Sequence, residues 1–408
     1  MEVVIHSKKG CPSCLKAKAF FKENNIEYKE VEHNDKEERL AFYEDLSRKL
    51  SRNIKSVPQI FVNGEYIGTY TSLLAKAQIV LNKKISMLEP SIVFRPFRYP
   101  WANEIFERHE AMHWVKEEVG MDEDISDWKI KGRLTDDEKN LITNILRMFT
   151  QGDVQVASNY YDQLIPRIKA NEIRNMLGSF AAREGIHQVA YALLNDSLGF
   201  PDSEYHSFLE YQEMLDKIEM MASENPSTQS GLAHCMARSV FNEGVMLFSS
   251  FAILLNFERR GRMKGMCKIV EWSVRDEMTH VEGVSKIFRS FCVEKPRIVN
   301  DEFKSHIYSM AEETIRAEDS FIDLVFSEYE IEGLTKEEIK LYIRYIGDRR
   351  LIQLGLKPIF GVKENPLVWM ENLLLGVNHT SFFEGKSTDY DVAGGKGKYE
   401  YSFIEDFS

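Results

Sequence analysis

The sequence predicts two domains of different class: an α/β domain over residues 1–84 and an all-α helical bundle over residues 101–384. In the first segment, short β-branched and aromatic runs alternate with helical segments. From Trp101 to Leu375, hydrophobic residues recur with helical period and almost no strand signal. Between the domains, residues 85–100 contain three prolines, which cannot continue a helix, so we expect an extended linker there.

Each element of the α/β segment follows from its local pattern. We expect strands at residues 3–6, 28–31, 59–62 and 66–68, and helices at about 13–24, 36–50 and 72–82. In the second half, turn-forming clusters at 196–202, 224–227 and 330–334 separate the helices. Residues 385–408 are rich in Gly, Lys and Ser and lack a core-building pattern, so a flexible C-terminal tail is expected.

Charge and composition exclude several classes of partner. The chain has 52 Lys and Arg against 64 Asp and Glu, a net charge of −12, and no basic run, so neither nucleic acid nor a membrane surface is expected as a partner. Apolar stretches such as Val245–Leu255 are shorter than the ~20 residues that span a bilayer. The start MEVVIH lacks the basic region of a signal peptide, which favours a cytoplasmic location.

The segment Cys11-Pro12-Ser13-Cys14 is the first candidate site. It follows a predicted strand and opens a predicted helix, where unpaired N–H groups favour a thiolate at Cys11. Lys8 and Lys9 add positive charge nearby, and Cys14 is within reach as a resolving thiol. The alternative is half of a zinc site, which needs two further ligands, and the other three cysteines are solitary and far along the chain. Dithiol chemistry is therefore favoured.

This segment resembles glutaredoxin over about 80 residues, through HSKKGCPSC and SVPQIFVNGEYIGTY. The resemblance implies a thioredoxin-like fold, with Cys11 as the nucleophile, Cys14 as the resolving thiol and a cis proline facing them. It also implies a glutathione site made of Lys8, Val57, Pro58, Gly68 and Thr69. The sequence departs from the family at Thr69, where many members have a second Gly. Thr71 and Ser72 stand in place of the usual acidic pair.

Four Glu-x-x-His pairs occur in the chain, where about 1.6 are expected by chance from its composition. The spacing places a carboxylate and an imidazole on one helical face, where both can reach a metal ion. Glu30 with His33 lies at the end of a predicted strand, and Glu110 with His113 lies among charges of both signs. We expect both of these pairs at the surface.

The other two pairs, Glu184 with His187 and Glu277 with His280, interrupt apolar helical stretches. Asp153 and Glu243 interrupt two further apolar helices, so four helices each bring an acid inward. A buried carboxylate is costly unless a cation compensates it. Four carboxylates and two neutral imidazoles balance two divalent ions, and these donors suit iron or manganese. The alternative is four unrelated buried acids that Arg or Ser side chains satisfy.

The order of these residues resembles the ferritin-like dimetal bundle, and residues 95–408 resemble the radical-generating β subunit of class I ribonucleotide reductase. The resemblance implies a dinuclear centre of two Fe, two Mn or one of each, held by Asp153, Glu184, His187, Glu243, Glu277 and His280. It implies a radical on Tyr191 and a relay through Trp114, Asp276 and His187. It also implies a homodimer whose tail, through Tyr390, docks on the catalytic α subunit. Leu247, Phe251 and Ser273 stand where the family has bulky apolar residues, which leaves open an oxidant that rests on the metals.

Together the two resemblances imply a ribonucleotide reductase β subunit that helps convert ribonucleoside diphosphates to deoxyribonucleotides. The fused glutaredoxin domain would re-reduce the disulfide of the α subunit with glutathione. Two other functions use the same ligands: a stand-alone dimetal oxidase or oxygenase with a tethered thiol reductant, and an iron-storage or scaffold protein.

Overall fold

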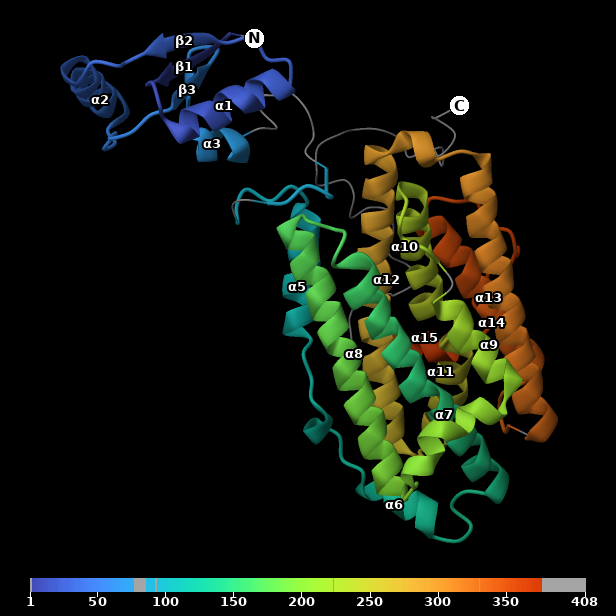
Figure 1. Ribbon diagram of the computed structural model, residues 1–408. Coiled ribbons are helices and arrows are strands. Elements are labelled where there is room, and N and C mark those ends of the chain that lie inside the picture. The colour runs from blue at the N-terminus through green and yellow to red at the C-terminus, as the bar shows by residue number, and fades with distance from the viewer. Residues whose placement is uncertain (1, 77–85, 92–93, 223, 330, 376–408) are drawn as a thin grey trace. The chain divides into compact units, whose positions relative to one another are not determined.

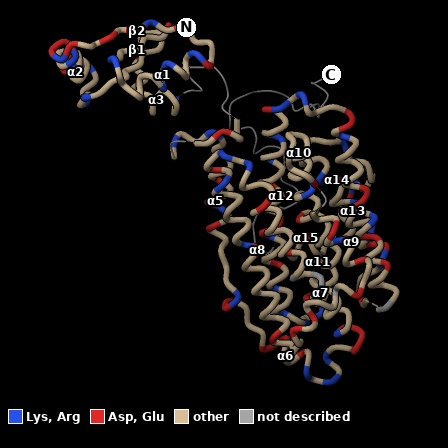
Figure 2. Tube along the Cα trace, viewed as in Figure 1, with Lys and Arg blue, Asp and Glu red and all other residues tan. Residues whose placement is uncertain are grey.

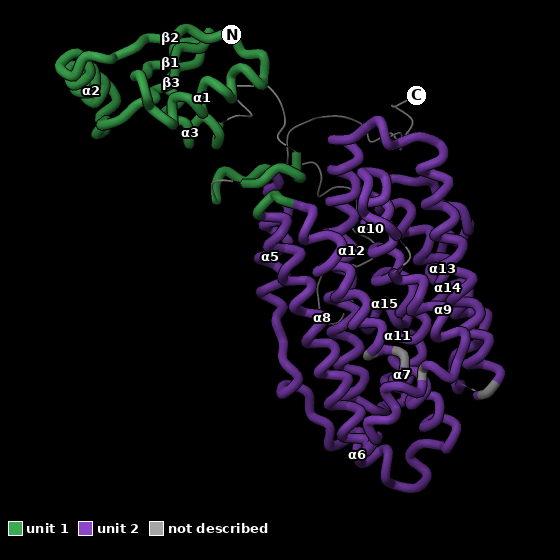
Figure 3. Tube along the Cα trace, in the orientation of Figure 1, with its two compact units in different colours: residues 1–98, 169–171 green, residues 99–168, 172–408 purple. Residues whose placement is uncertain are grey.

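The computed structural model of the chain describes residues 2–76, 86–91, 94–222, 224–329 and 331–375. It divides into two compact units, Met1–Arg98 with Lys169–Asn171, and Tyr99–Ile168 with Glu172–Ser408 (Figure 3). The predicted tail over 385–408, with Tyr390, lies outside the described residues. Residues 77–82 of the helix predicted at 72–82 lie outside them as well.

The first unit contains a four-stranded mixed sheet with helices around it (Figure 1). Its strands are β1 (Val3–Ser7), β2 (Lys29–Glu32), β3 (Gln59–Val62) and β4 (Glu65–Gly68), and its helices are α1 (Pro12–Glu23), α2 (Lys36–Leu50) and α3 (Tyr70–Ala75). The strand order is β2-β1-β3-β4, with β1 and β2 parallel and the other pairs antiparallel. This confirms the predicted α/β class.

Local sequence explains where these helices begin. Pro12 occupies the first turn of α1, where a missing N–H breaks no helical hydrogen bond, and Cys11 is the N-cap. Asp35 caps α2 by accepting hydrogen bonds from the N–H groups of Glu37 and Glu38. The core between sheet and helices is apolar and contains Val3, Ile5, Ala17, Phe21, Ile60, Val62, Ile67 and Leu73.

The expectation of a surface position for Glu30 and His33 is wrong for the histidine. His33 is 6% exposed, and its ring stacks on Phe42 of α2 at 4.2 Å between centroids. Its Nε2 lies 2.9 Å from Nδ1 of His6, a residue of β1, the strand next to β2. The chain leaving β2 therefore packs beneath α2, which a strand pattern alone does not show. Glu110 and His113 are exposed, as predicted.

The second unit is an all-helical bundle, as predicted (Figure 1). Its α-helices are α5 (Pro100–Ala111), α6 (Asp122–Lys129), α7 (Asp136–Ser158), α8 (Asn171–Leu198), α9 (Gln212–Met221), α10 (Gln229–Gly244), α11 (Phe248–Leu255), α12 (Lys264–Glu294), α13 (Asp301–Glu328), α14 (Lys336–Gln353) and α15 (Val368–Leu375). A π-helical segment, η2 (Asn159–Leu164), continues α7.

Helices α10 and α11 form the centre of this bundle. Every residue from Cys235 to Asn256 is buried, and Figure 2 shows no charged residue along α11. The segment Gln229–Arg260 is long and apolar enough to cross a membrane, but its most apolar stretch is wholly buried among the other helices. An element that is apolar on all sides is typical of a bundle core. The polar side chains that do lie in this core therefore need an explanation.

The histidine pair of the first unit, the half-buried His6 and the buried His33, predicts a pH-dependent stability. Burial first, and the charge of His33 second, lower the pKa of His6 to about 4. An unfolded histidine titrates near 6.5, so between these values the unfolded chain holds the extra proton. The stability that His6 contributes is therefore complete above about pH 6.5 and is lost as pH falls toward about 4.

We expect the calorimetric melting temperature of the first unit, measured in the full chain, to fall between about pH 7 and about pH 4.5. His6→Phe keeps a ring that can stack on Phe42 but removes the titration, so the variant should lose less stability over the same interval. Equal losses in the two proteins would contradict this assignment.

Candidate functional site

Four helices of the bundle bring six predicted side chains into one buried cluster. The residues are Asp153 of α7, Glu184 and His187 of α8, Glu243 of α10, and Glu277 and His280 of α12. Each is at most 1% exposed. Both Glu-x-x-His pairs keep carboxylate and imidazole on one helical face, as the three-residue spacing requires.

The cluster has two overlapping halves. In each half, one ligand-type atom per residue lies within 4.8 Å of all the others. The first half contains Asp153, Glu184, His187 and Glu277, and the second contains Glu184, Glu243, Glu277 and His280. Glu184 and Glu277 belong to both halves, so these two carboxylates can bridge two adjacent cation positions.

Both imidazoles direct Nδ1 toward the carboxylates. Nδ1 of His187 is 3.3 Å from Glu184 Oε2 and 3.3 Å from Glu277 Oε1. Nδ1 of His280 is 3.0 Å from Glu184 Oε1 and 3.1 Å from Glu243 Oε2. Several of the converging atoms are buried without a hydrogen-bond partner, namely Asp153 Oδ2, both oxygens of Glu184, His187 Nδ1 and Glu277 Oε2. Such atoms are costly to bury, and metal ions would satisfy them.

The electrostatics of the cluster also favour bound cations. Burial lowers the pKa of His187 and of His280, but the surrounding carboxylates outweigh it and raise both pKa values well above the usual range. Burial raises the pKa of Asp153 well above that of a free aspartate, and it raises the pKa of Glu243 to about 7. The cluster therefore attracts positive charge. The buried Glu and His donor set fits a dimetal centre.

The outer nitrogen of His187 faces a second buried carboxylate. His187 Nε2 is 3.3 Å from Asp276 Oδ2, and Trp114 Nε1 donates to the same oxygen at 2.7 Å. The guanidinium of Arg183 donates to Asp276 at 2.9 Å. Burial raises the pKa of Asp276, but its hydrogen bond to His187 and the charges of His187 and Arg183 hold that pKa well below the usual range. The three residues predicted as a relay, Trp114, Asp276 and His187, therefore lie in one hydrogen-bonded line.

The predicted radical tyrosine is buried one turn after His187. Tyr191 is 1% exposed, and its hydroxyl donates to Ser273 Oγ at 3.1 Å. Burial, and then the charge of Asp153, raise the pKa of Tyr191 well above its usual value, so the phenol keeps its proton. Its ring contacts Phe149, which packs in turn against Phe251. Ser273 is 1% exposed and its hydroxyl faces the tyrosine rather than water.

His109 is a site residue that the sequence analysis missed. Its Nε2 lies 3.2 Å from His280 Nε2, and its Nδ1 lies 3.1 Å from Ser179 Oγ, which donates to the carbonyl of Met176. Burial, followed by the charge of His280, lowers the pKa of His109 to about 2, so the ring is neutral. The consistent assignment has His280 donating to His109 and His109 donating to Ser179, which leaves His280 Nδ1 free for a metal.

A second missed group surrounds Glu243. Tyr160 donates to Glu243 Oε2 at 2.5 Å, and Ser239 donates to Oε1 at 2.9 Å. Asn159 donates in turn to Ser239 at 2.7 Å. The sequence does carry a signal for Tyr160, because it stands two helical turns after Asp153 and so on the same face. These contacts fix the orientation of the Glu243 carboxylate.

The cysteines of the first unit form a disulfide with each other, as dithiol chemistry requires, and the three remaining cysteines are free and buried in the second unit. Cys11 caps α1, and its Sγ accepts the N–H of Cys14 at 3.2 Å. Sγ of Cys11 is 3.5 Å from the carbonyl oxygen of Val57, and the Val57–Pro58 bond is cis. The structure thus brings Val57 and Pro58 beside the cysteine pair.

The other residues predicted to bind glutathione differ in their surroundings. Gly68 has φ +118°, and a Cβ there would lie 2.5 Å from Ser72 Oγ, so the position requires glycine. Thr69 follows as the N-cap residue of α3, with Oγ1 3.5 Å from Ser72 Oγ. Lys8 is exposed.

Comparison with known proteins identifies relatives for both units. The family described as ribonucleotide reductase, small chain, matches residues 91–366, and the glutaredoxin family matches residues 3–67. The probable ribonucleoside-diphosphate reductase small subunit 376L of Invertebrate iridescent virus 6 is 38% identical over 358 residues, which cover 77% of this chain and 98% of the viral protein. Subunit 048L of Invertebrate iridescent virus 3 is 39% identical over 337 residues, covering 78% and 89%.

Among solved structures, the ribonucleotide reductase R2 subunit from Clostridium botulinum superimposes with a TM-score of 0.63 and 25% identity. The match covers 68% of this chain and 88% of that chain. The curated relatives of this chain are reductase small subunits, and they align with it over most of their length. The fold and the buried cluster therefore occur in a chain that is similar to these subunits.

The contact between His109 and His280 predicts an effect on metal affinity. His109→Phe keeps a ring beside Phe180 but removes the acceptor for His280 Nε2. We expect one of two bound Mn²⁺ equivalents to bind about 10–100-fold more weakly, the usual cost of losing a hydrogen-bond partner behind a metal-binding histidine. Equilibrium dialysis with metal analysis measures this, with the exposed His113→Phe as the control. Unchanged affinity for both equivalents would show that His109 only packs.

Proposed function

We propose, because the chain belongs to the ribonucleotide reductase small-chain family, that its helical unit generates the oxidant with which a catalytic α subunit converts ribonucleoside diphosphates to deoxyribonucleotides. Membership makes the chain the small subunit of an oxidoreductase and implies partnership with the large, catalytic subunit. It also disfavours a stand-alone oxidase or a storage protein. We further propose that the glutaredoxin domain reduces the α subunit between turnovers.

One observation carries the proposal for the helical unit: six donor side chains from four helices meet in a cluster with shared carboxylates and unpartnered inward atoms. Asp153, Glu184, His187 and Glu277 would hold one ion, and Glu184, Glu243, Glu277 and His280 the other. Two redox-active ions, either two Fe, two Mn or one of each, would supply a strong one-electron oxidant there. Iron and manganese accept the same ligands, so the choice between them follows from availability and activation chemistry.

The line of Trp114, Asp276 and His187 supports a route for the oxidising equivalent to leave the buried cluster. The indole N–H and the imidazole both contact one carboxylate oxygen. His187 and Arg183 keep that carboxylate ionised, so Asp276 can accept the hydrogen bond of the indole N–H. Trp114 is 2% exposed and its ring lies 5.9 Å from that of His187. Oxidation of Trp114 would therefore place the hole one side chain away from the metal ligands.

Tyr191 is proposed to hold the radical. Its burial excludes water, and Phe149 covers one side of the ring. Ser273 accepts the hydrogen bond of the phenol. Once the phenol has lost its proton and an electron, the hydroxyl of Ser273 can rotate and donate a hydrogen bond to the phenoxyl oxygen instead. A polar residue at position 273 therefore does not bring water to the tyrosine, because the Ser273 hydroxyl is buried and hydrogen-bonded to Tyr191.

The cysteine geometry supports thiol–disulfide exchange in the glutaredoxin domain. The Cys11 thiolate would attack a disulfide of the α subunit and form a mixed disulfide, and Cys14 would attack Cys11 to release the α subunit as a dithiol. The Cys11–Cys14 disulfide would be the oxidised product of this exchange. Two glutathione thiols would reduce it again and leave as glutathione disulfide. We propose Lys8, Val57, Pro58, Gly68 and Thr69 as the glutathione contacts.

The proposal extends to two features that the sequence suggested. The C-terminal tail would dock on the α subunit, with Tyr390 as the residue that passes the radical between subunits. The helical units of two chains would form a homodimer, as the family resemblance implies, and the protein would act in the cytoplasm.

Replacement of Tyr191 tests the oxidant. In protein activated with both Fe and Mn available, we expect a tyrosyl radical signal in electron paramagnetic resonance that Tyr191→Phe abolishes. Nucleotide reduction with the purified α subunit should fall by at least ~100-fold, because a positioned catalytic group typically contributes ~10²–10⁴-fold. Trp114→Phe is the matched control, since it should keep the radical signal and lose reduction. Full activity in Tyr191→Phe would show that the metals themselves store the oxidant.

The cysteine pair is tested by the choice of reductant. With glutathione as the sole thiol, Cys11→Ser should stop nucleotide reduction after about one turnover, because the nucleophilic thiolate is lost. A chemical dithiol that reduces the α subunit directly should restore turnover, which separates loss of reductant from loss of folding. Continued turnover of Cys11→Ser with glutathione alone would rule out the reductant role.

A further inference from the structure

A second group of potential metal ligands lies apart from the dimetal cluster. Glu224 precedes α10, His234 lies in the second turn of α10, and His306 lies in the second turn of α13, which packs against α10. One ligand atom from each lies within 4.8 Å of the other two. Glu243 stands nine residues after His234 on the same helix, so the two sites are roughly 14 Å apart along its axis.

The spacing of these side chains suits one small cation. His306 Nε2 is 3.2 Å from both oxygens of Glu224, and the rings of His234 and His306 lie 4.3 Å apart between centroids. Ligand atoms bonded at about 2.0–2.1 Å to a tetrahedral ion are about 3.3–3.4 Å apart. An ion between the three side chains would therefore need only small rotations of rings and carboxylate.

An ordinary ion pair between Glu224 and His306 does not explain the position of His234 beside them. The contact between His306 and Glu224 is a surface ion pair in its own right, but it does not engage His234. Nε2 of His234 is buried and has no hydrogen-bond partner. A buried nitrogen without a partner is costly unless something binds it.

A hydrogen bond to the backbone of Phe303 orients the ring of His234. Since Nε2 has no partner, the bond to Phe303 is left to Nδ1, and this arrangement leaves the Nε2 lone pair free.

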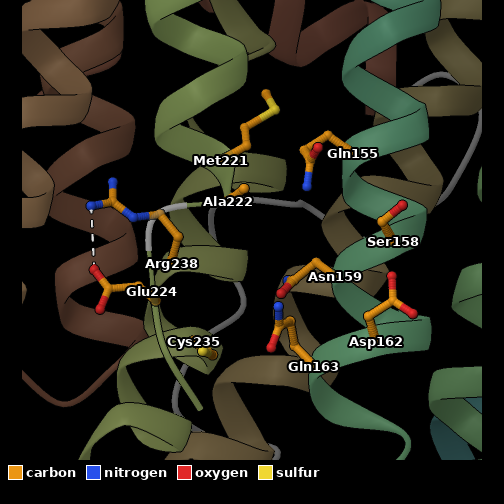
Figure 4. Close-up of a pocket in the computed structure, with 10 residues that line it drawn as sticks. All are labelled: Gln155, Ser158, Asn159, Asp162, Gln163, Met221, Ala222, Glu224, Cys235 and Arg238. Atoms are coloured by element: carbon orange, nitrogen blue, oxygen red, sulfur yellow. Dashed lines mark ion pairs between the residues drawn. The ribbon is translucent and has the colours of Figure 1, made fainter. Parts of the chain in front are cut away.

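The surroundings of Glu224 are polar. Figure 4 shows its carboxylate facing Arg238 in an ion pair of 3.7 Å, at the wall of a cavity of about 60 Å³ that Asn159, Asp162 and Gln163 line on the other side. Arg238 also donates to Glu313 at 3.4 Å, so its charge is shared between two carboxylates. Of the three proposed ligands, Glu224 lines this cavity, which has room for about two waters beside its carboxylate.

We propose that Glu224, His234 and His306 form a third metal site, which binds one divalent ion of the Zn²⁺ class with two imidazoles, one carboxylate and water. Imidazole and carboxylate together suit zinc and neighbouring transition metals. The ion would join the segment before α10 to the second turns of α10 and α13. The protein would then bind three metal ions per chain. Total metal analysis would therefore overestimate the occupancy of the dimetal centre.

The test uses the full chain with its dimetal centre already filled with Mn²⁺. Equilibrium dialysis against Zn²⁺, with elemental analysis of both metals, should show a total of three divalent ions per chain, one more than the six-residue cluster holds, whichever metal occupies that cluster. We expect His234→Gln and His306→Gln each to weaken zinc binding by at least ~100-fold, since loss of even an outer partner costs ~10–100-fold. His306 has a side chain that is 46% exposed, so its replacement should leave the fold intact. The exposed His113→Gln is the matched control and should bind zinc as the parent does.

Two results would overturn the site. One is the absence of a third equivalent at up to about 100 µM free Zn²⁺, a concentration that a three-ligand site should saturate. The other is loss of zinc in His306→Gln together with unchanged binding in both His234→Gln and Glu224→Gln, which would place an adventitious ion on a surface histidine. Neither result affects the proposed reductase function, which the Tyr191 and Cys11 variants test separately.

Discussion

The helical unit depends on one constraint: four carboxylates are buried at the centre of an apolar bundle, and no Lys or Arg of the described chain forms an ion pair with any of them. The same bundle shows the alternative solution. Glu318 is also fully buried, but the ammonium of Lys217 neutralises it at 2.5 Å. Asp153, Glu184, Glu243 and Glu277 have only two imidazoles beside them, which cannot balance four negative charges. Bound metal ions would balance the remaining negative charge.

The two histidines of the cluster contact different groups on the side away from the carboxylates. Behind His187 stands the ionised Asp276, held by Arg183 and in contact with Trp114. Behind His280 stands the neutral His109, which leads only to Ser179 and a backbone carbonyl. An anion behind an imidazole makes it a stronger donor to a metal than a neutral ring does. Of these two sides, only the first joins the cluster to an indole, and this is the side on which the proposed function places electron transfer.

The six residues of the buried cluster could be predicted from the sequence because acids are conspicuous where a helix is otherwise apolar, and because i, i+3 spacing places each Glu and His pair on a common face. His109 could not be found in this way. It lies in a helix with charges of both signs, and only the packing of α5 against α12 shows that one face of that helix is buried. His33 escaped for a related reason, since its burial comes from packing against Phe42 of α2 and His6 of β1, which a strand pattern does not show. Tyr160 was visible by its position on the face of Asp153, but tyrosines in apolar helices are usually core residues.

The two chemistries in this chain make opposite demands on their surroundings. A persistent radical such as the one proposed for Tyr191 must be kept from water and from thiols, and Tyr191 and the six cluster residues are each at most 1% exposed inside the bundle. The cysteine pair lies in the other unit, where Cys11 caps a helix beside Val57 and the sheet has its own apolar core. Because each unit has a separate core, a substitution in one need not disturb the other. The proposed oxidant and the proposed reductant thus lie in units with separate apolar cores.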